Sequence, residues 1–407
     1  MRQSKKDRKS LPEAFVETTF KGVREGSLST PVVQLTEVRI DRFRNLATAS
    51  IEVPVEGAIL VGANGQGKTN FLEAIHFLSR FRSFRGTRHG DAIAFGSGHF
   101  RIEAGIRYRD GRSHTLAVAA DGDRRRVTVD GAAVSRPHEV AGTLLAVTLR
   151  PEDLELVSGS PESRRAYVDE LLSLASRPYR RALGQYDRVL RQRNELLRSA
   201  GASLTQIDAW DEALIAAGVG VVVARARLVG RLAERFAATA ARVAADGEAR
   251  EYEVEYAPSV PVDPALAESE ETVRGAWSRA LVERYEVDRA RGWTTVGPHR
   301  DDLSIRQGGR DLARYGSQGE RRTAAVALRL MEAEVLEADT GHRPVLLLDD
   351  VFSELDEGRS ERLLECLGER HQRFVTSPRP LPWLADGLAR WTVAAGRIET
   401  MTAVAAG

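Results

Sequence analysis

Residues 58–75 read Ala-Ile-Leu-Val-Gly-Ala-Asn-Gly-Gln-Gly-Lys-Thr-Asn-Phe-Leu-Glu-Ala-Ile, and they are the most informative stretch of this chain. The first four residues form a short apolar run of the kind found in buried strands. From Phe71 onward, apolar residues recur at helical spacing. Between the two lies Gly62–Thr69, which fits the P-loop pattern of glycine, four residues and Gly-Lys-Ser/Thr. We therefore expect a strand, a phosphate-binding loop and a helix in this order.

Each residue type in this loop has a physical role beside a phosphate. Glycines let the backbone turn so that its N–H groups point at phosphate oxygens, and the helix N-terminus adds positive potential. We expect Lys68 to reach the β- and γ-phosphates of ATP and the Thr69 hydroxyl to bind Mg²⁺. The alternative is a glycine-rich turn that carries Lys-Thr by chance. The expected nucleotide contacts are Gly62, Ala63, Asn64, Gly65, Gln66, Gly67, Lys68 and Thr69.

The use of lysine makes Lys68 more specific. The chain has 59 basic residues, of which five are lysine. Four of them stand near the start, at positions 5, 6, 9 and 21, and Lys68 is the fifth. A position that stays lysine in an arginine-rich chain indicates a need for a compact ammonium, which a planar guanidinium does not replace. This need favours contact with phosphate over a chance Lys-Thr.

Two further stretches could complete such a site. Val345–Leu348 is an apolar strand followed by Asp349 and Asp350. We expect Asp349 to act on the Mg²⁺ side and Asp350 to polarise an attacking water; a turn cap or a pair with an arginine is the alternative. Ser317-Gln318-Gly319-Glu320 opens a strongly helical segment and fits a capping box. A cap does not exclude a phosphate contact, because both use a helix N-terminus.

Composition limits the class of protein. The chain has 407 residues, 42% of them hydrophobic and 29% charged, with a net charge of +1. This near balance gives no whole-protein attraction to nucleic acid, so any such partner must meet local patches. We see neither a run of eighteen apolar residues nor a signal peptide, and we expect no membrane span. The single cysteine, Cys366, fits a small core residue in a reducing, cytoplasmic setting.

The pattern along the chain predicts an α/β protein with a helical insertion. Residues 1–31 resemble a disordered basic leader. Alternating strands and the P-loop fill 32–150, and a helical lobe fills 151–290, with long helices from Pro161 to Gly247 and one obvious break at Ser199–Leu204. Residues 291–407 return to strands and helices. We expect one nucleotide-binding lobe built from both ends of the chain, because the two ends share this pattern.

The order of these motifs resembles that of ABC-type ATPases of the SMC-like class, and more specifically the RecF family of bacterial recombination mediators. Besides the P-loop, Ser317-Gln318-Gly319 and Asp349-Asp350, the matching blocks are Phe43-Arg44-Asn45, Arg82-Ser83-Phe84-Arg85, Pro151-Glu152-Asp153-Leu154, Gln192-Arg193-Asn194, Gly297-Pro298-His299-Arg300-Asp301-Asp302 and Ser353-Glu354-Leu355-Asp356. The resemblance implies an ABC-type head, with mixed sheets around a P-loop core and an inserted helical lobe.

The resemblance also implies roles for individual residues. Two heads would sandwich two ATP molecules, so that Ser317 of one copy completes the site of the other in trans. Arg44 would lie near the nucleotide, and Lys68, Asp350 and Ser317 would serve a weak ATPase used as a switch. The protein would dimerise on ATP and bind gapped duplex DNA or single-strand/double-strand junctions. It would work with RecR, and with RecO and RecA in the pathway, in repair, fork maintenance and the SOS response.

The DNA contacts themselves are less well marked. Arg80, Arg82, Arg85 and Arg88 form a basic stretch after the P-loop helix, of which Arg82, Arg85 and Arg88 are our candidates. Arg124-Arg125-Arg126 is a second basic cluster, at an expected hairpin. Such clusters hold phosphates without reading sequence, but a solvated charged face is the alternative for both.

Two other classes compete with this interpretation. A transporter ATP-binding subunit normally has a shorter stretch between P-loop and signature serine, and a long-armed SMC-like scaffold needs a coiled coil that we do not find. Three departures from the RecF pattern stand out: the longer leader, Glu320 where glutamine is common, and Ser377-Pro378 where a polar switch residue is expected.

Overall fold

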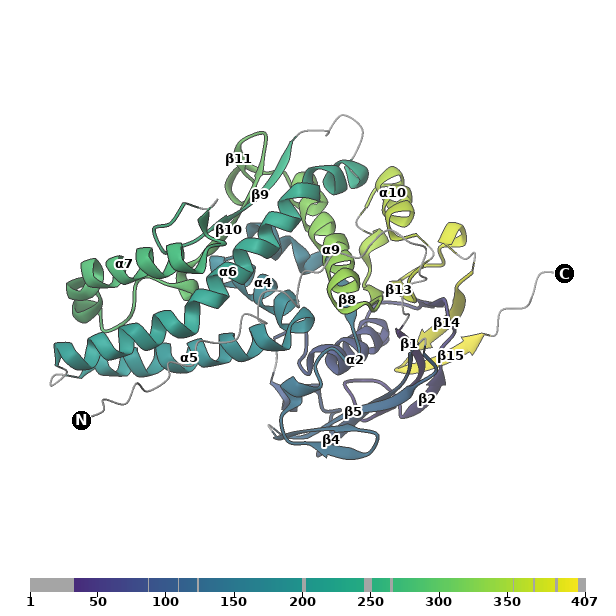
Figure 1. Ribbon diagram of the computed structural model, residues 1–407. Helices are drawn as coiled ribbons and strands as arrows, with labels where there is room; N and C mark the ends of the chain where they lie inside the picture. Colours follow the sequence, from purple (N-terminus) through teal and green to yellow (C-terminus); the bar gives the residue numbers. More distant parts are fainter. Residues whose placement is uncertain are drawn as a thin grey trace.

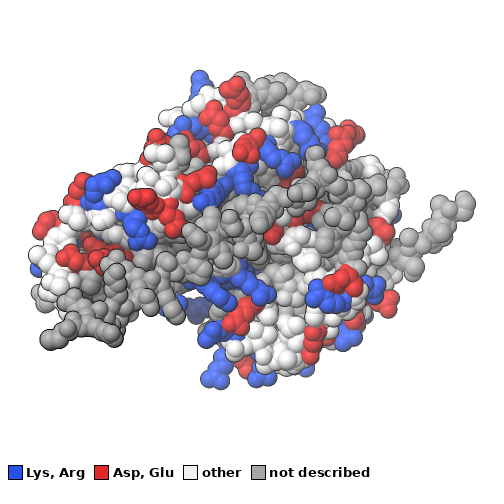
Figure 2. All heavy atoms as spheres, viewed as in Figure 1, with Lys and Arg blue, Asp and Glu red and all other residues white. Residues whose placement is uncertain are grey.

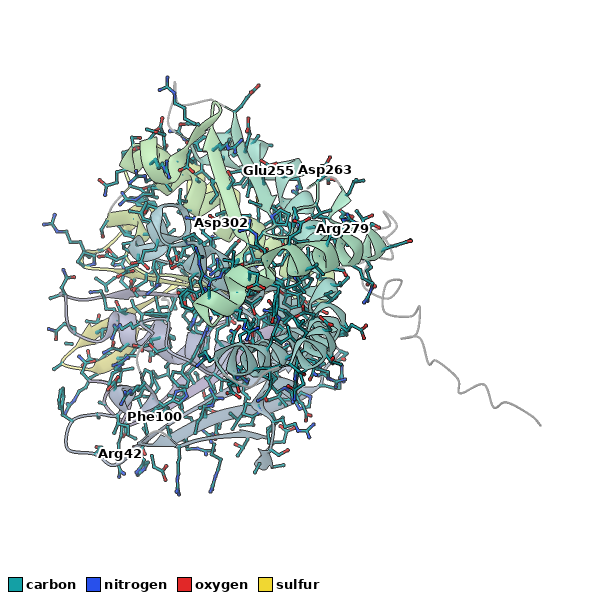
Figure 3. The ribbon with its side chains drawn as sticks, turned by 90° about the vertical axis from the view of Figure 1, so that its left-hand side faces the viewer. Arg42, Phe100, Glu255, Asp263, Arg279 and Asp302 are labelled. Atoms are coloured by element: carbon teal, nitrogen blue, oxygen red, sulfur yellow. The ribbon has the colours of Figure 1, made fainter. Side chains whose placement is uncertain are left out.

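The structure is a computed structural model, and Figure 1 shows two parts, a sheet-rich part and a helical lobe. It describes residues 33–86, 88–108, 110–122, 124–199, 203–244, 251–263, 266–353, 355–368, 370–384 and 387–401. The leader expected over residues 1–31 lies outside this set. Figure 3 shows the same molecule from the side, with Phe100 in the sheet-rich part and Asp302 in the region of the small sheet.

The central sheet has six strands in the order β15-β14-β3-β13-β12-β8. They are β3 (Gly57–Val61), β8 (Ala146–Leu149), β12 (Val345–Leu348), β13 (Arg373–Ser377), β14 (Ala389–Ala394) and β15 (Arg397–Met401). All neighbours pair in parallel except β14 and β15. β8 and β12 are buried throughout, as continuous apolar runs in parallel sheets are. One sheet is therefore built from both ends of the chain, as expected.

A second, antiparallel sheet lies on the other side of the P-loop helix. Its order is β2-β1-β4-β5-β6-β7. The strands are β1 (Val33–Asp41), β2 (Ala49–Glu52), β4 (His99–Tyr108), β5 (Ser113–Asp121), β6 (Arg124–Val129) and β7 (Ala132–Val134). Between the sheets lies α2 (Lys68–Arg80). Its Phe71 ring meets those of Phe374 and Trp391 in the central sheet, and Phe77 meets Phe100 in the antiparallel sheet, with ring centroids 5.4–5.8 Å apart.

The helical lobe differs from the prediction at one point. Its long helices are α4 (Pro161–Ala175), α5 (Arg177–Arg198), α6 (Leu204–Val243) and α7 (Glu270–Arg291). The predicted break at 199–204 is confirmed, but a second break at Ser176 was missed. There the serine side chain accepts from the Tyr179 backbone N–H, and Pro178 occupies the first turn. A serine cap followed by proline starts a new helix, which a count of apolar residues does not reveal.

The remaining elements complete the head. A small antiparallel sheet, β11-β10-β9, joins β9 (Tyr252–Ala257), β10 (Asp302–Gln307) and β11 (Arg310–Asp311). The other helices are α3 (Glu155–Ser158), α8 (Leu312–Tyr315), α9 (Gln318–Thr340) and α10 (Glu357–Leu367). One apolar core runs without interruption from the helical lobe to the central sheet, where Leu346, Leu348 and Val375 join it. The lobe is thus firmly seated on the face of the sheet opposite α2.

Among the described residues, one helix, α6, is long and apolar enough to cross a membrane by length and composition alone. Its most apolar window is 61% buried inside the protein. Val222, Leu232 and Phe236 from this helix lie in the main core. The apolar character of α6 is therefore accounted for by packing between α5, α7 and α9.

Candidate nucleotide-binding site

The carboxyl ends of three neighbouring parallel strands form the base of a pocket. β3 ends at Val61 before the P-loop, β12 ends at Leu348 before Asp349, and β13 lies between them. The pocket encloses about 640 Å³ of empty space. It is lined by Asn64, Gly65, Gly67, Lys68, Thr69, Asn70, Arg85, Asp350 and Thr376. The fold thus brings together the two halves of the predicted site, which are far apart in sequence.

Two glycines of the loop, Gly62 and Gly67, have neighbours too close to leave room for a side chain. A Cβ atom on Gly62 would lie 2.1 Å from the Val393 carbonyl oxygen. Gly67 has φ 116° at the N-cap of α2, and a Cβ there would lie 2.8 Å from Leu46. These positions need glycine for space and, at Gly67, for its positive φ. The C-terminal hairpin that crowds Gly62, formed by β14 and β15, was not predicted from the sequence.

Lys68 is the central cation of the pocket. Its Nζ donates to the carbonyl oxygens of Gly62, at 2.7 Å, and Ala63, at 3.0 Å. Burial lowers the pKa of Lys68, whereas the charges of Asp350 and Asp349 raise it. The compact ammonium, with three donors, fits under the loop, and its contact with phosphate stays a prediction.

Asp349 is held by two threonine hydroxyls. Thr69 Oγ1 and Thr376 Oγ1 each donate to Asp349 Oδ1 at 2.8 Å. Burial raises the pKa of Asp349, and these hydrogen bonds lower it. A hydroxyl beside a carboxylate is the oxygen donor set that Mg²⁺ takes beside phosphates. Among the described residues no group of three or more His, Cys, Asp or Glu side chains is arranged for a metal, so the donors fit an ion shared with phosphate oxygens and water.

Asp350 turns toward the pocket through an unusual backbone. Its φ is 52°, a left-handed conformation that costs a non-glycine residue about 1–3 kcal/mol. Its backbone N–H donates to Thr376 Oγ1 at 2.9 Å, and its carboxylate accepts from the Ser353 hydroxyl. Thr376 therefore touches both acidic residues. The sequence predicts a polar switch residue where Ser377 stands, but the Ser377 hydroxyl bonds to the Arg379 backbone instead. The sequence assigned no role to Thr376.

A buried carboxylate, Glu73 on α2, holds two arginines, of which Arg85 lines the pocket and Arg44, predicted near the nucleotide, does not. Arg44 Nη2 lies 2.6 Å and Arg85 Nη1 lies 3.2 Å from its oxygens, and the Ser83 hydroxyl donates to it at 2.6 Å. Arg85 also donates to Asn70 Oδ1 at 2.9 Å. The arginine that we had expected at DNA therefore faces the nucleotide pocket. DNA contact by Arg85 stays a prediction that this placement does not favour.

The other two DNA candidates lie elsewhere. Arg82 pairs with Glu170 at 2.9 Å and remains more than half exposed. Arg88 is exposed, and its backbone N–H donates to Asp91. Arg82 shares a cleft with Arg125 of the second basic cluster. One arginine of each basic cluster predicted from the sequence therefore lies in the same cleft.

Ser317 lies outside the pocket formed by its own chain. It caps α9, accepting from the Glu320 backbone N–H at 3.2 Å while Glu320 accepts from the Ser317 backbone N–H at 2.8 Å. The predicted capping box is confirmed. The serine is exposed and is absent from the residues that line the nucleotide pocket. Its accessible helix N-terminus is free to meet a second molecule.

Known proteins resemble this chain over most of its length. The family model "RecF/RecN/SMC N terminal domain" matches residues 34–381. "DNA replication and repair protein RecF" of Gloeobacter violaceus is 37% identical over 347 residues, which cover 84% of this chain and 91% of that protein. The same protein of Frankia alni is 37% identical over 380 residues, covering 90% and 99%. This chain belongs to the RecF family.

Solved structures agree with RecF membership. The structure titled "recombination mediator protein RecF-ATP in RecFOR pathway" has a TM-score of 0.84, with 31% identity over 93% of this chain and 100% of that chain. Its RecF-ATPrS counterpart has a TM-score of 0.82 and 30% identity. An Smc head domain from Pyrococcus furiosus has a TM-score of 0.52 at 15% identity, and shares the fold. The expected ABC-type head is confirmed, and RecF membership excludes a transporter subunit.

Proposed function

We propose that this RecF-family protein, which acts in DNA replication and repair, binds ATP and Mg²⁺ in the pocket at Gly62–Thr69 and dimerises on ATP. In this state it holds gapped duplex DNA and single-strand/double-strand junctions. It works with RecR there, and with RecO and RecA in the wider pathway, in the cytoplasm. Slow ATP hydrolysis then releases the dimer, so that ATP serves as a switch.

The observation that carries this proposal is that Ser317 is exposed and lies outside the pocket formed by its own P-loop. Lys68, Thr69 and Asp350 line that pocket, and Thr69 bonds to Asp349 beside it. Ser317 begins an exposed helix whose N-terminal N–H groups favour an anion. A second copy that presents Ser317 across the pocket completes it. Two copies facing each other complete two such sites, as expected for an isologous dimer.

The residues of the pocket then take separate roles. Lys68 and the loop N–H groups offset the negative charge of the phosphates, and Arg85 is held at the wall by Glu73. Asp350, fixed by Thr376 and Ser353, orients the attacking water and accepts its proton. Thr69 and Asp349 would hold Mg²⁺, which when bound would neutralise charge at the phosphate oxygens.

The test compares ATP-dependent dimerisation of the intact protein with that of Lys68→Arg and Ser317→Ala on gapped duplex DNA. Lys68→Arg is expected to lose ATP binding and dimerisation. Ser317→Ala is expected to bind ATP as a monomer and to lose dimerisation or turnover. Ser203→Ala is the matched control, because Ser203 caps α6 in a capping box of the same type. A protein that stays monomeric with ATP would refute the composite site.

A further inference from the structure

The exposed face of α5 carries a line of arginines. Arg177, Arg181, Arg188, Arg191 and Arg198 are all exposed, and they follow one another at intervals of three, four or seven residues. Such intervals place side chains on one side of a helix. The helix has 22 residues, so this α5 arginine face extends roughly 30 Å at 1.5 Å per residue.

These arginines have few local electrostatic contacts: the charge of Arg191 acts on Asp187 without an ion pair between them. None of the five forms an ion pair with a carboxylate in the described part of the chain. Arg188 and Arg198 donate only to helix carbonyls, those of Gly184 and Asn194. The exposed acids of α5 are Asp187 and Glu195. On α7, also 22 residues long, exposed arginines alternate instead with exposed glutamates, among them Glu270, Glu271, Glu283 and Glu286.

The arginine face also contains a glycine that the fold does not require. Gly184 lies within the helix, where glycine costs about 0.5–1 kcal/mol relative to alanine. A Cβ added there would meet nothing within 4 Å. By contrast, a Cβ on Gly218 of α6 would lie 2.4 Å from Trp277. A bare backbone in the middle of a basic face permits the close approach of a large ligand.

The N-terminal end of the arginine face opens into a basic cleft. This cleft lies where the helical lobe meets the antiparallel sheet, and encloses about 970 Å³ of empty space. Its walls include Arg82, Arg125 and Arg180. Figure 2 shows blue side chains gathered at the lower centre of the view, between the two parts of the molecule. Two acids line the cleft, and both are already paired with arginines. Burial would raise the pKa of Glu170, but the charges of Arg80 and Arg82 lower it to about 2. Asp169 pairs with Arg225 at 2.8 Å.

Arg80 gives the cleft a buried donor without a partner. Its side chain is 3% exposed, and Nη2 donates to Glu332 at 2.6 Å. Its Nη1 atom has no hydrogen-bond partner among the described residues. A buried guanidinium N–H without an acceptor is costly in a folded protein. The cleft therefore offers an unused donor to an anionic group.

We infer that the α5 arginine face and the adjoining cleft form a track for the phosphate backbone of duplex DNA. This inference rests on the proposed function, and it assigns the DNA contact to a surface outside the nucleotide pocket. Arginines spaced along about 30 Å match roughly one turn of B-form DNA, which is about 34–36 Å long. The contacts hold phosphates and read no bases, so they suit a protein that acts at gaps of any sequence.

A duplex fits this surface better than a single strand does. Proteins that hold single strands without sequence preference stack bases on aromatic side chains. The two tyrosines of α5, Tyr179 and Tyr186, are buried. The other exposed positions of α5 between the arginines are Pro178, Gly184, Gln185, Asp187, Gln192 and Glu195, none of which offers an aromatic stacking surface. An acidic protein partner is the competing ligand, and the experiment separates it.

The experiment measures binding of a fluorescent duplex by anisotropy at several salt concentrations, with ATP present. The variant is Arg181→Ala/Arg188→Ala. The control is Arg279→Ala/Arg284→Ala, which removes two exposed arginines from α7, where Arg279 is labelled in Figure 3. Two lost phosphate contacts lower the slope of log affinity against log salt by about 2, and affinity falls roughly tenfold or more. The control keeps the affinity and slope of the intact protein.

Several outcomes would overturn the inference. One is an unchanged salt slope in the α5 variant, which would leave the arginine face to an acidic protein or to solvent. Another is a loss confined to single-stranded DNA. Arg191→Ala/Arg198→Ala repeats the test at the far end of the helix and is expected to give the same change. ATP-dependent dimerisation is measured in parallel. If the intact protein does not dimerise, the proposed function is wrong. If the α5 variant still dimerises but binds the duplex more weakly, its defect is specific to the DNA contact.

Discussion

Thr376 shows how a neutral side chain can fix the two acids of the proposed site, Asp349 and Asp350. Its hydroxyl donates to Asp349 and accepts from the backbone N–H of Asp350, and the residue is 1% exposed. The Asp350 backbone depends on this contact, because its φ of 52° is unfavourable. The strand that carries Thr376 lies between β3 and β12, so the residue sits beside both halves of the pocket.

We predict that Thr376→Val slows ATP hydrolysis more than it weakens ATP binding. Valine fills the same space, but leaves the Asp350 N–H without a partner, at a cost of about 1–3 kcal/mol in the free energy of unfolding. A small displacement of Asp350 is expected to slow turnover roughly ten- to a hundredfold. Single-turnover hydrolysis and urea unfolding measure the two effects.

The neighbouring serine supplies the control for this prediction. Ser377 is equally buried, but its hydroxyl bonds to the Arg379 backbone outside the pocket. Ser377→Ala should therefore retain turnover. Equal turnover in Thr376→Val and Ser377→Ala would show that Thr376 does not position Asp350.

At the scale of elements, the Gly-Pro-His-Arg-Asp-Asp segment braces the helical lobe. It includes the short turn η5 (Pro298–Arg300) that leads into β10. Buried Asp301 accepts from the Tyr256 hydroxyl and from the Ser259 N–H, and pairs with Arg225 of α6. Asp302 pairs with Arg164 of α4 at 2.7 Å. The segment that distinguished the family in sequence therefore joins two helices to the small sheet.

His299 makes this brace sensitive to pH. Burial lowers its pKa to about 4. Its Nε2 faces the Thr294 carbonyl oxygen at 2.9 Å, so this nitrogen carries the proton and Nδ1 accepts from the Tyr186 hydroxyl. Protonation of Nδ1 would break that bond. Since the unfolded pKa is about 6.5, the unfolded state binds more protons between pH 6.5 and 4.

We therefore predict that the contribution of His299 to stability is full above pH 6.5 and is lost as pH falls toward 4. The loss is about 1.4 kcal/mol per pH unit in the free energy of unfolding. His299→Gln removes this contribution, so its stability should fall less steeply over that range. Urea unfolding followed by tryptophan fluorescence measures the slopes, with His114→Gln, on a partly exposed strand position, as control. Parallel curves for intact protein and His299→Gln would contradict the prediction.

At the scale of the whole molecule, the nucleotide site proposed here depends on two copies. Lys68 lies at one end of the central sheet, whereas Ser317 begins the exposed end of α9. Within one chain, Ser317 does not line the pocket that contains Lys68. Under the proposed function, this separation would let ATP join two copies.

We predict that mixing Lys68→Arg with Ser317→Ala restores part of the ATPase activity that each variant lacks alone. In a mixed dimer, the intact P-loop of the Ser317→Ala copy meets the intact Ser317 of the Lys68→Arg copy, which makes one complete site. Steady-state phosphate release on gapped duplex DNA measures this recovery. If Ser317 acts within its own chain, the mixture would be as inactive as its components.

The sequence alone determined the local parts of this protein. The P-loop, the Val345–Leu348 strand and the cap at Ser317 follow from residue type and short-range spacing, which fix backbone conformation within a few residues. The order of these parts indicated the family. The break at Ser176 was also present in the sequence as a serine cap and proline, but the helical periodicity on both sides hid it.

Only the tertiary structure decided which distant residues meet. Parallel pairing of β3, β13 and β12 brings Thr69 and Thr376 to the same oxygen of Asp349. No short-range sequence pattern specifies how these three strands align. Burial against Glu73 turns Arg85 to the nucleotide, although its neighbours in sequence suggested DNA. Spacing along the sequence places the arginines of α5 on one side of the helix, and packing of the opposite side against α6 leaves them exposed. Chain connectivity fixes the elements, whereas packing and long-range hydrogen bonds choose the contacts between them.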